Sequence, residues 1–122
     1  MMKVAVMGLN MGHAWAKAAV DLPNTELCMV YDPAFNENPQ INRDYFQEKK
    51  IPVAATEEEV YASDANVIVV ASPDHFHTEQ SVKALEAGKH VICEKPLAPT
   101  VEDCRKIIDA VRKTGKFFMT GQ

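Results

Sequence analysis

Short apolar runs alternate with segments of helical periodicity along the whole chain. The runs predict strands at residues 4–7, 26–31, 52–55, 66–71, 89–93 and 116–122. Apolar residues three and four apart predict helices at residues 12–22, 43–50, 56–62, 72–87 and 100–114. Because the connections suit only strand–helix–strand units, we expect one α/β domain over residues 1–122. Its doubly wound parallel sheet should hold about six strands in the order 3-2-1-4-5-6.

The ends of several helices carry capping signals. Thr56 and Thr100 each precede a helical pattern and have an acidic residue three positions later, which predicts a side-chain cap at both starts. Gly88 and Gly115 follow the last periodic residue of two helices, where the left-handed backbone favours glycine.

The first helix has an apolar stripe that we expect to face the sheet. Its members are Met11, Trp15, Ala18, Ala19 and Leu22. On this interpretation Trp15 is a core residue rather than a ligand contact.

The composition of the chain argues against several classes of function. The net charge of −4 provides no basic surface for nucleic acid. No apolar run approaches the roughly 20 residues that cross a membrane, and the first residues lack the features of a signal peptide. Three cysteines, an odd number, indicate reduced thiols in a cytoplasmic protein. The sequence has no Cys/His spacing typical of a metal site, so we expect none.

The turn after the first strand, Gly8-Leu9-Asn10-Met11-Gly12, predicts a dinucleotide-binding site. Glycines there let the backbone approach a pyrophosphate, and the following helix presents free N–H groups to it. On the pattern G-x-G-x-x-G, Asn10 and His13 replace the second and third glycines. Alternatively Gly12 is the last glycine and the loop is one residue short, which we favour. A plain strand–helix connection would look similar.

Four residues that follow predicted strands, Gly8, Asp32, Ser72 and Glu94, should meet at the carboxyl edge of the sheet. Asp32 lies about twenty residues after the turn, where an acid accepts from the adenosine ribose. A carboxylate there repels a 2′-phosphate, so we expect NAD and regard NADP as the weaker candidate. The alternative role for Asp32 is to cap the turn before Pro33.

The segment 72–77 should begin a helix whose N–H groups, near Ser72 and Pro73, face the cofactor. Ser72 or Asp74 should serve as its N-cap. His75 and His77 are two positions apart and point in different directions on a helix, which disfavours a metal site. One of them is expected to line the pocket.

Glu94-Lys95-Pro96 follows the fifth predicted strand, beside the expected nicotinamide position. Lys95 could deliver or accept a proton as hydride moves. From spacing alone, a solvated lysine in a proline-rich loop is the simpler interpretation. A cis bond before Pro96 would fix the lysine backbone.

Residues 71–77 (ASPDHFH) and 84–98 (ALEAGKHVICEKPLA) resemble the N-terminal domain of the Gfo/Idh/MocA oxidoreductases. The resemblance covers nearly the whole chain. It implies a Rossmann domain that binds NAD or NADP, followed by an α+β domain that supplies most of the substrate pocket and the oligomer contacts. Substrates in this family are commonly sugars, polyols and related cyclic compounds.

The resemblance also implies roles for individual residues. Lys95 of the E-K-P motif becomes the catalytic or substrate-positioning lysine, with Glu94 before it. Pro73, Asp74 and His77 match the motif P-N-x-x-H, with Asp74 in place of asparagine, and His77 becomes the second catalytic candidate. The complete cofactor-binding set is Gly8, Asn10, Met11, Gly12, Asp32, Ser72, Pro73, His77, Glu94 and Lys95.

Three hypotheses of function follow, in order of preference. First, the chain is the NAD-binding part of a sugar or polyol oxidoreductase; it lacks the family's second domain, so it would meet a substrate only together with one. Second, it is a stand-alone module that binds CoA or another adenine nucleotide without catalysis. Third, the exposed last strand, around residues 117–119, pairs with another chain, including a second copy of this one.

Overall fold

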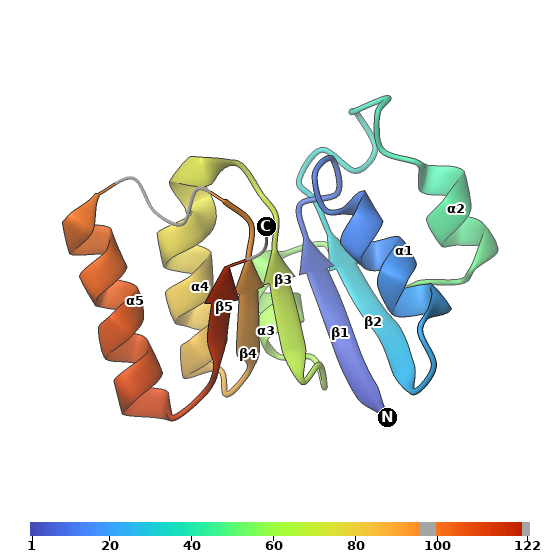
Figure 1. Cartoon of the computed structure of the whole chain (residues 1–122). Helices are drawn as coiled ribbons and strands as arrows, with labels where there is room; N and C mark the ends of the chain where they lie inside the picture. Colours follow the sequence, from blue (N-terminus) through green and yellow to red (C-terminus); the bar gives the residue numbers. More distant parts are fainter. Residues whose placement is uncertain (96–99, 121–122) are drawn as a thin grey trace.

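The structure, a computed structural model, describes residues 1–95 and 100–120 (Figure 1). Its strands are β1 (Met2–Met7), β2 (Thr25–Tyr31), β3 (Val67–Val70), β4 (His90–Cys93) and β5 (Phe118–Thr120). Its helices are α1 (His13–Asp21), α2 (Arg43–Glu48), α3 (Glu57–Tyr61), α4 (His77–Glu86) and α5 (Val101–Thr114). A short 3₁₀ helix, η1 (Asp74–Phe76), precedes α4. The predicted strand–helix alternation is confirmed.

The sheet is parallel throughout its described strands, in the order β2-β1-β3-β4-β5. The expected strand at 52–55 is reduced to one bridge, between Val53 and Val30 of β2. The carbonyl of Pro52 and the amide of Ala54 bond to Val30 on either side of that bridge, at 3.0 and 2.8 Å. Pro52 has no N–H for a longer ladder, and Thr56, the cap residue of α3, follows two residues after Ala54. The sheet therefore has five strands in place of about six, and the bridge lies where the third strand was expected.

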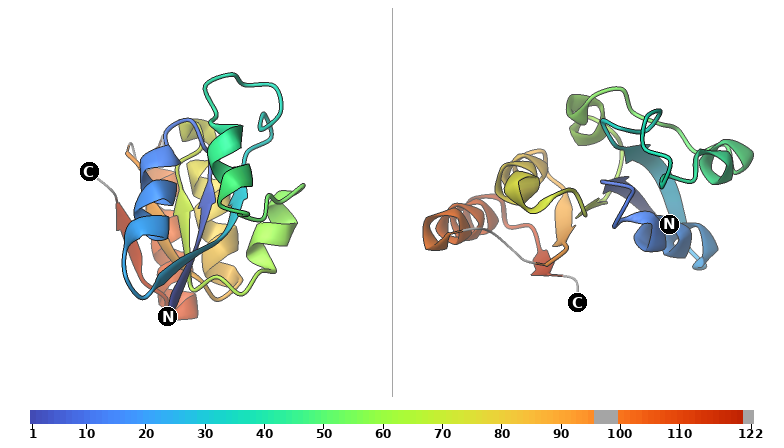
Figure 2. Two further views of the ribbon diagram at one scale, coloured as in Figure 1. Left: turned by 90° about the vertical axis from the view of Figure 1, so that its right-hand side faces the viewer. Right: turned by 90° about the horizontal axis from the view of Figure 1, so that it is seen from above.

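Helices cover both faces of the sheet (Figure 2). In β1, Val4 and Val6 belong to the core on the side of α1 and α2. Ala5 and Met7 belong to the core on the side of α3, α4 and α5. This alternation confirms the doubly wound arrangement. The carboxyl ends of all parallel strands lie at one edge of the sheet, the upper edge in Figure 1.

The apolar stripe expected on α1 is wrong in detail. Ala16 and Ala19 are buried against the sheet, while Met11, Ala18 and Leu22 are exposed. Small residues occupy the contact because α1 lies close to β1, and larger side chains would push it away. Trp15 is partly buried against the core, as expected.

Capping predictions were correct at α3 and α5 and wrong at α4. The hydroxyls of Thr56 and Thr100 accept hydrogen bonds from the third residue of their helices, at 3.3 and 3.0 Å. Neither Ser72 nor Asp74 caps α4, which begins at His77 after η1 without a side-chain cap. Pro73, in an extended conformation, delays the helix by several residues.

Candidate cofactor-binding site

A cavity of about 300 Å³ opens at the carboxyl edge of the sheet, where the turns after β1, β2 and β3 meet. It lies at the point where the strand order reverses, between β1 and β3, which is where open α/β sheets bind ligands. Its size suits a nucleoside more than a whole dinucleotide. It is lined by Gly8, Asn10, Met11, Tyr31, Asp32, Pro33, Ala34, Asn38, Glu57, Ala71, Ser72, Pro73, Phe76 and Gln80.

Two glycines allow the turn after β1 to lie against the turn after β3. Gly8 has φ +91°, and a Cβ there would be 2.5 Å from the backbone nitrogen of Ser72. A Cβ on Gly12 would overlap the carbonyl oxygen of Gly8 and lie 2.8 Å from Cγ1 of Val6. Gly12 is the N-cap residue of α1, directly before His13. This geometry supports the short-loop interpretation, in which Gly12 is the last glycine of the turn.

Asp32 connects the turns after β1 and β2. Its Oδ2 accepts from the backbone amide of Leu9 at 2.8 Å, and its Oδ1 accepts from the amide of Ala34 at 2.8 Å. The capping role weighed for Asp32 is therefore present. Each carboxylate oxygen keeps a second acceptor position, so the same group can also accept from ribose hydroxyls.

A chain of hydrogen bonds links Ser72, Gln80 and Glu57 in the lining of the cavity. The hydroxyl of Ser72 donates to the side-chain oxygen of Gln80, whose Nε2 donates to Oε2 of Glu57 at 3.3 Å. The hydroxyl of Tyr61 donates to Oε1 of Glu57 at 3.0 Å. Burial, together with the neighbouring carboxylate, raises the pKa of Tyr61, so it remains a donor.

Two carboxylates, Asp32 and Glu57, give the cavity a negative wall. Burial raises the pKa of Tyr31, and the charges of Glu57 and Asp32 raise it further, so both acids act on one phenol. Among the described lining residues there is no lysine, arginine or histidine. Such a wall favours hydroxyl and amino donors over phosphate.

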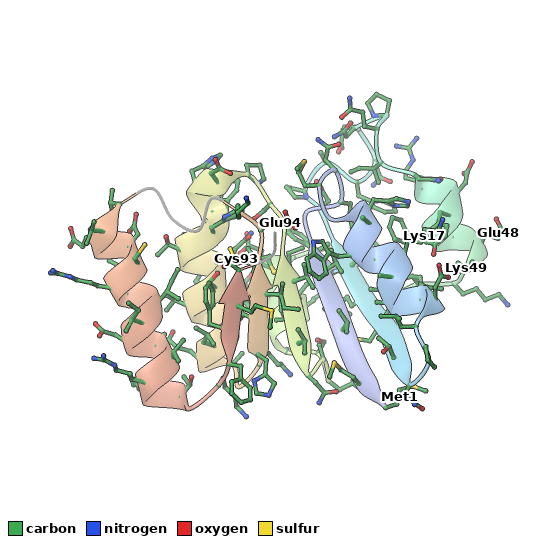
Figure 3. The ribbon with its side chains drawn as sticks, in the orientation of Figure 1. Met1, Lys17, Glu48, Lys49, Cys93 and Glu94 are labelled. Atoms are coloured by element: carbon green, nitrogen blue, oxygen red, sulfur yellow. The ribbon has the colours of Figure 1, made fainter. Side chains whose placement is uncertain are left out.

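The Glu94-Lys95 segment lies farther along the same edge of the sheet, after β4. Oε1 of Glu94, labelled in Figure 3, accepts from the indole nitrogen of Trp15 in α1 at 2.6 Å. The Glu94 amide bonds to the carbonyl of Val70 at 2.9 Å, which holds this turn beside β3. Lys95 is exposed, as in the simpler interpretation of its loop. Pro96 lies outside the described residues, so the cis bond considered before it stays a prediction.

The structure places the expected site residues in four different positions. Gly8, Asn10, Met11, Asp32, Ser72 and Pro73 line the cavity. Gly12 ends the turn, against the carbonyl oxygen of Gly8, and does not line the cavity. Glu94 and Lys95 follow β4. His77 is buried, with its Nε2 at 2.7 Å from the carbonyl oxygen of Ser72, whereas His75 is exposed. Sequence reasoning missed Glu57 and Gln80, because only folding brings α3 and α4 to the same wall.

A larger hollow of about 700 Å³ lies between α4 and α5. Charged side chains such as Glu79, Lys83, Asp103 and Lys106 line it, and all of its lining residues belong to η1, α4 and α5. It is a wide, open groove in which oppositely charged helix residues pair, as Lys83 does with Glu79 at 2.9 Å. The smaller cavity at the switch point is therefore the candidate cofactor site.

In residues 1–95 and 100–120, no three His, Cys, Asp or Glu side chains gather as a metal site. None of the helices in these ranges has the length and hydrophobicity needed to cross a bilayer.

A doubly wound parallel sheet, a glycine turn at its switch point and an acid after the second strand define a dinucleotide-binding α/β domain. The family model described as "Oxidoreductase family, NAD-binding Rossmann fold" matches residues 2–122. The chain therefore belongs to the Gfo/Idh/MocA oxidoreductases and is their NAD-binding Rossmann domain, which confirms the resemblance drawn from the sequence.

Individual relatives agree with this assignment. An uncharacterized oxidoreductase of Streptococcus pneumoniae is 32% identical over 123 residues, which cover 99% of this chain and 32% of that protein. Inositol 2-dehydrogenase of Klebsiella pneumoniae is 51% identical over 57 residues, 47% of this chain and 17% of that protein. The structure of GenD2 from gentamicin A biosynthesis, in complex with NAD, superposes with a TM-score of 0.86 at 27% identity. That match covers 98% of this chain and 34% of GenD2, so the chain spans about a third of the length of these proteins.

Proposed function

We propose that this chain binds NAD along the carboxyl edge of its sheet and serves as the cofactor-binding part of a sugar or polyol oxidoreductase. The cavity at the switch point carries the proposal, because six of the ten expected cofactor-binding residues line it. In this arrangement the adenosine occupies the cavity and the pyrophosphate lies over Gly8 and Gly12, at the start of α1. The nicotinamide then points toward Glu94 and Lys95.

The charge of the cavity favours NAD over NADP. Asp32 holds the adenosine ribose through its hydroxyls, using the acceptor positions left free by Leu9 and Ala34. A 2′-phosphate would meet the carboxylates of Asp32 and Glu57 in a wall without a basic lining residue among those described.

Bound NAD supplies hydride transfer at its nicotinamide ring, and the chain's own residues supply position and a proton. We assign the proton to the ammonium group of exposed Lys95. Glu94, fixed by Trp15, orients the strand end before it. His77 is buried on the carbonyl of Ser72, which supports a positioning role for it in place of the expected catalytic one.

The remaining parts of the proposal concern the whole protein. Its relatives are about three times longer, which supports a further domain that holds the substrate. Phe117 and Met119, on or beside the edge strand β5, are 76% and 62% exposed, which supports a contact with another chain or copy there. All three cysteines are free thiols, which supports a cytoplasmic location.

Calorimetric titration of the chain with NAD, NADP and CoA tests the proposal. We expect saturable binding of NAD and at least roughly tenfold weaker binding of NADP. Asp32→Asn should weaken NAD about tenfold and reduce the preference over NADP. Asp21→Asn, the same change at the exposed last residue of α1, is the matched control and should bind like the unmodified chain.

Two results would overturn the proposal. One is the absence of NAD binding at millimolar concentration. The other is tighter binding of CoA than of NAD, which would favour the stand-alone nucleotide module. If Asp32→Asn bound NAD as the control does, the ribose assignment alone would be wrong.

A further inference from the structure

Glu57, the first residue of α3, places a carboxylate in the wall of the cavity. In the sequence it is one of three consecutive acids, Glu57 to Glu59, after the cap residue Thr56. In the structure the three have separate surroundings. Glu59 accepts from the amide of Ala55 at 3.4 Å, Glu58 is exposed, and Glu57 is partly buried and faces the site.

Neighbouring donors hold the Glu57 carboxylate in one position. Tyr61 donates to one oxygen at 3.0 Å, and Gln80, itself only 3% exposed, donates to the other at 3.3 Å. Each bond occupies one of the two acceptor positions on its oxygen. The group is therefore fixed in orientation and can still accept a hydrogen bond from a ligand.

The direction of the bonds also determines what Ser72 can offer. Because the amide nitrogen of Gln80 points to Glu57, the amide oxygen of Gln80 points to Ser72. Ser72 uses its single hydroxyl proton on that oxygen, so toward the cavity it can only accept. Glu57 and Ser72 thus present acceptors to the cavity, in addition to those of Asp32.

The rest of the lining suits a flat apolar ring. The lining also includes the apolar side chains of Met11, Pro33, Ala34, Pro73 and Phe76. A base enclosed among them makes its specific contacts at the ring edge. If Asp32 takes the ribose hydroxyls, the base attached to that ribose lies in the same cavity as Glu57.

We propose that Glu57 is a specificity residue that accepts a hydrogen bond from the exocyclic amino group of adenine, so that the cavity selects a 6-aminopurine over a 6-oxopurine. This inference rests on the proposed NAD-binding function. The amino group carries the only N–H donors on the adenine ring. An oxo group in its place would direct an acceptor at an anionic acceptor, and the N–H donor of a 6-oxopurine lies one ring position away, on N1, so the contact at this position becomes repulsive.

The test compares NAD with nicotinamide hypoxanthine dinucleotide, which differs from it by an oxo group in place of the amino group and by the proton on the adjacent N1. Calorimetry on the unmodified chain should give roughly tenfold tighter binding of NAD. In Glu57→Gln the side-chain NH₂ can donate to the oxo group, so the two affinities should fall within about twofold of each other. Glu58→Gln, with the same charge change one residue away, should keep the full preference.

Each outcome separates this inference from the proposed function. Equal binding of both dinucleotides to the unmodified chain would refute the role of Glu57 and leave NAD binding intact. Equal loss of preference in Glu57→Gln and Glu58→Gln would show a general charge effect and also refute it. Binding of neither dinucleotide would remove the proposed function as well. The comparison on the unmodified chain decides the question even if Glu57→Gln fails to fold.

Discussion

Gly12→Ala tests the close packing of the glycine turn. Gly12 has φ −86°, an angle that any residue adopts. On backbone entropy alone, alanine there should stabilise the chain by about 0.4–1 kcal/mol. The new Cβ, however, would overlap the carbonyl oxygen of Gly8 and lie 2.8 Å from Cγ1 of Val6 and 3.1 Å from Cβ of Ala71. The steric and entropic arguments therefore predict changes of opposite sign in the stability of Gly12→Ala.

The size of the effect follows from what would have to move. The first overlap is with backbone, and Val6 is fully buried, so neither neighbour can turn away. The start of α1 would have to shift by roughly 1 Å to restore ordinary carbon contacts. Overpacking of this kind costs about 3 kcal/mol, which lowers the Tm of a domain of this size by about 10 °C.

Thermal and urea unfolding of Gly12→Ala and Gly115→Ala measure the loss of stability in each variant. Gly115 has φ +71° and open space around its Cβ position, so its alanine variant isolates backbone strain. That strain should cost about 1 kcal/mol. We expect Gly12→Ala to be clearly less stable than Gly115→Ala and to lose NAD binding. A Gly12→Ala chain as stable as the unmodified one would refute the short-loop geometry.

Two further predictions concern Cys93 and Lys95. Burial raises the pKa of Cys93 to about 11, so above pH 9 the unfolded thiol ionises while the folded one does not. Stability should therefore fall as pH rises from about 9 to 11; urea unfolding across that range should show a smaller fall for Cys93→Ala, and an equal fall would contradict the assignment. With the chain fused to the rest of a family oxidoreductase, Lys95→Ala should lower kcat by at least about 100-fold with unchanged NAD affinity; full activity would show that Lys95 is only a loop residue.

The sequence predicted most of the fold because local signals and global arrangement agree. Apolar runs, glycine stops and threonine caps each reflect physics within a few residues, and they marked the five strands of the sheet, its five α-helices and the topology. The segment at 52–55 had the composition of a strand. A strand, however, also needs consecutive N–H donors, which Pro52 interrupts.

The site was predictable where one residue has one function. Gly8, Gly12 and Asp32 follow from the demands of a turn and a strand end, and they lie where these demands place them. The place of Glu57 and Gln80 in the cavity wall was not predictable, because it comes from a contact between two residues that are 23 positions apart and belong to different helices. The bond from Trp15 to Glu94, across 79 positions, was missed for the same reason.

Amide NMR spectra of the chain during titration with NAD test the central claim most directly. We predict that the largest chemical-shift changes occur in the turn of residues 8–12, at Asp32 and Ala34, and at Ser72. Residues 101–114 of α5 should be nearly unaffected. Changes concentrated in the groove between α4 and α5, or none at saturating NAD, would contradict the account.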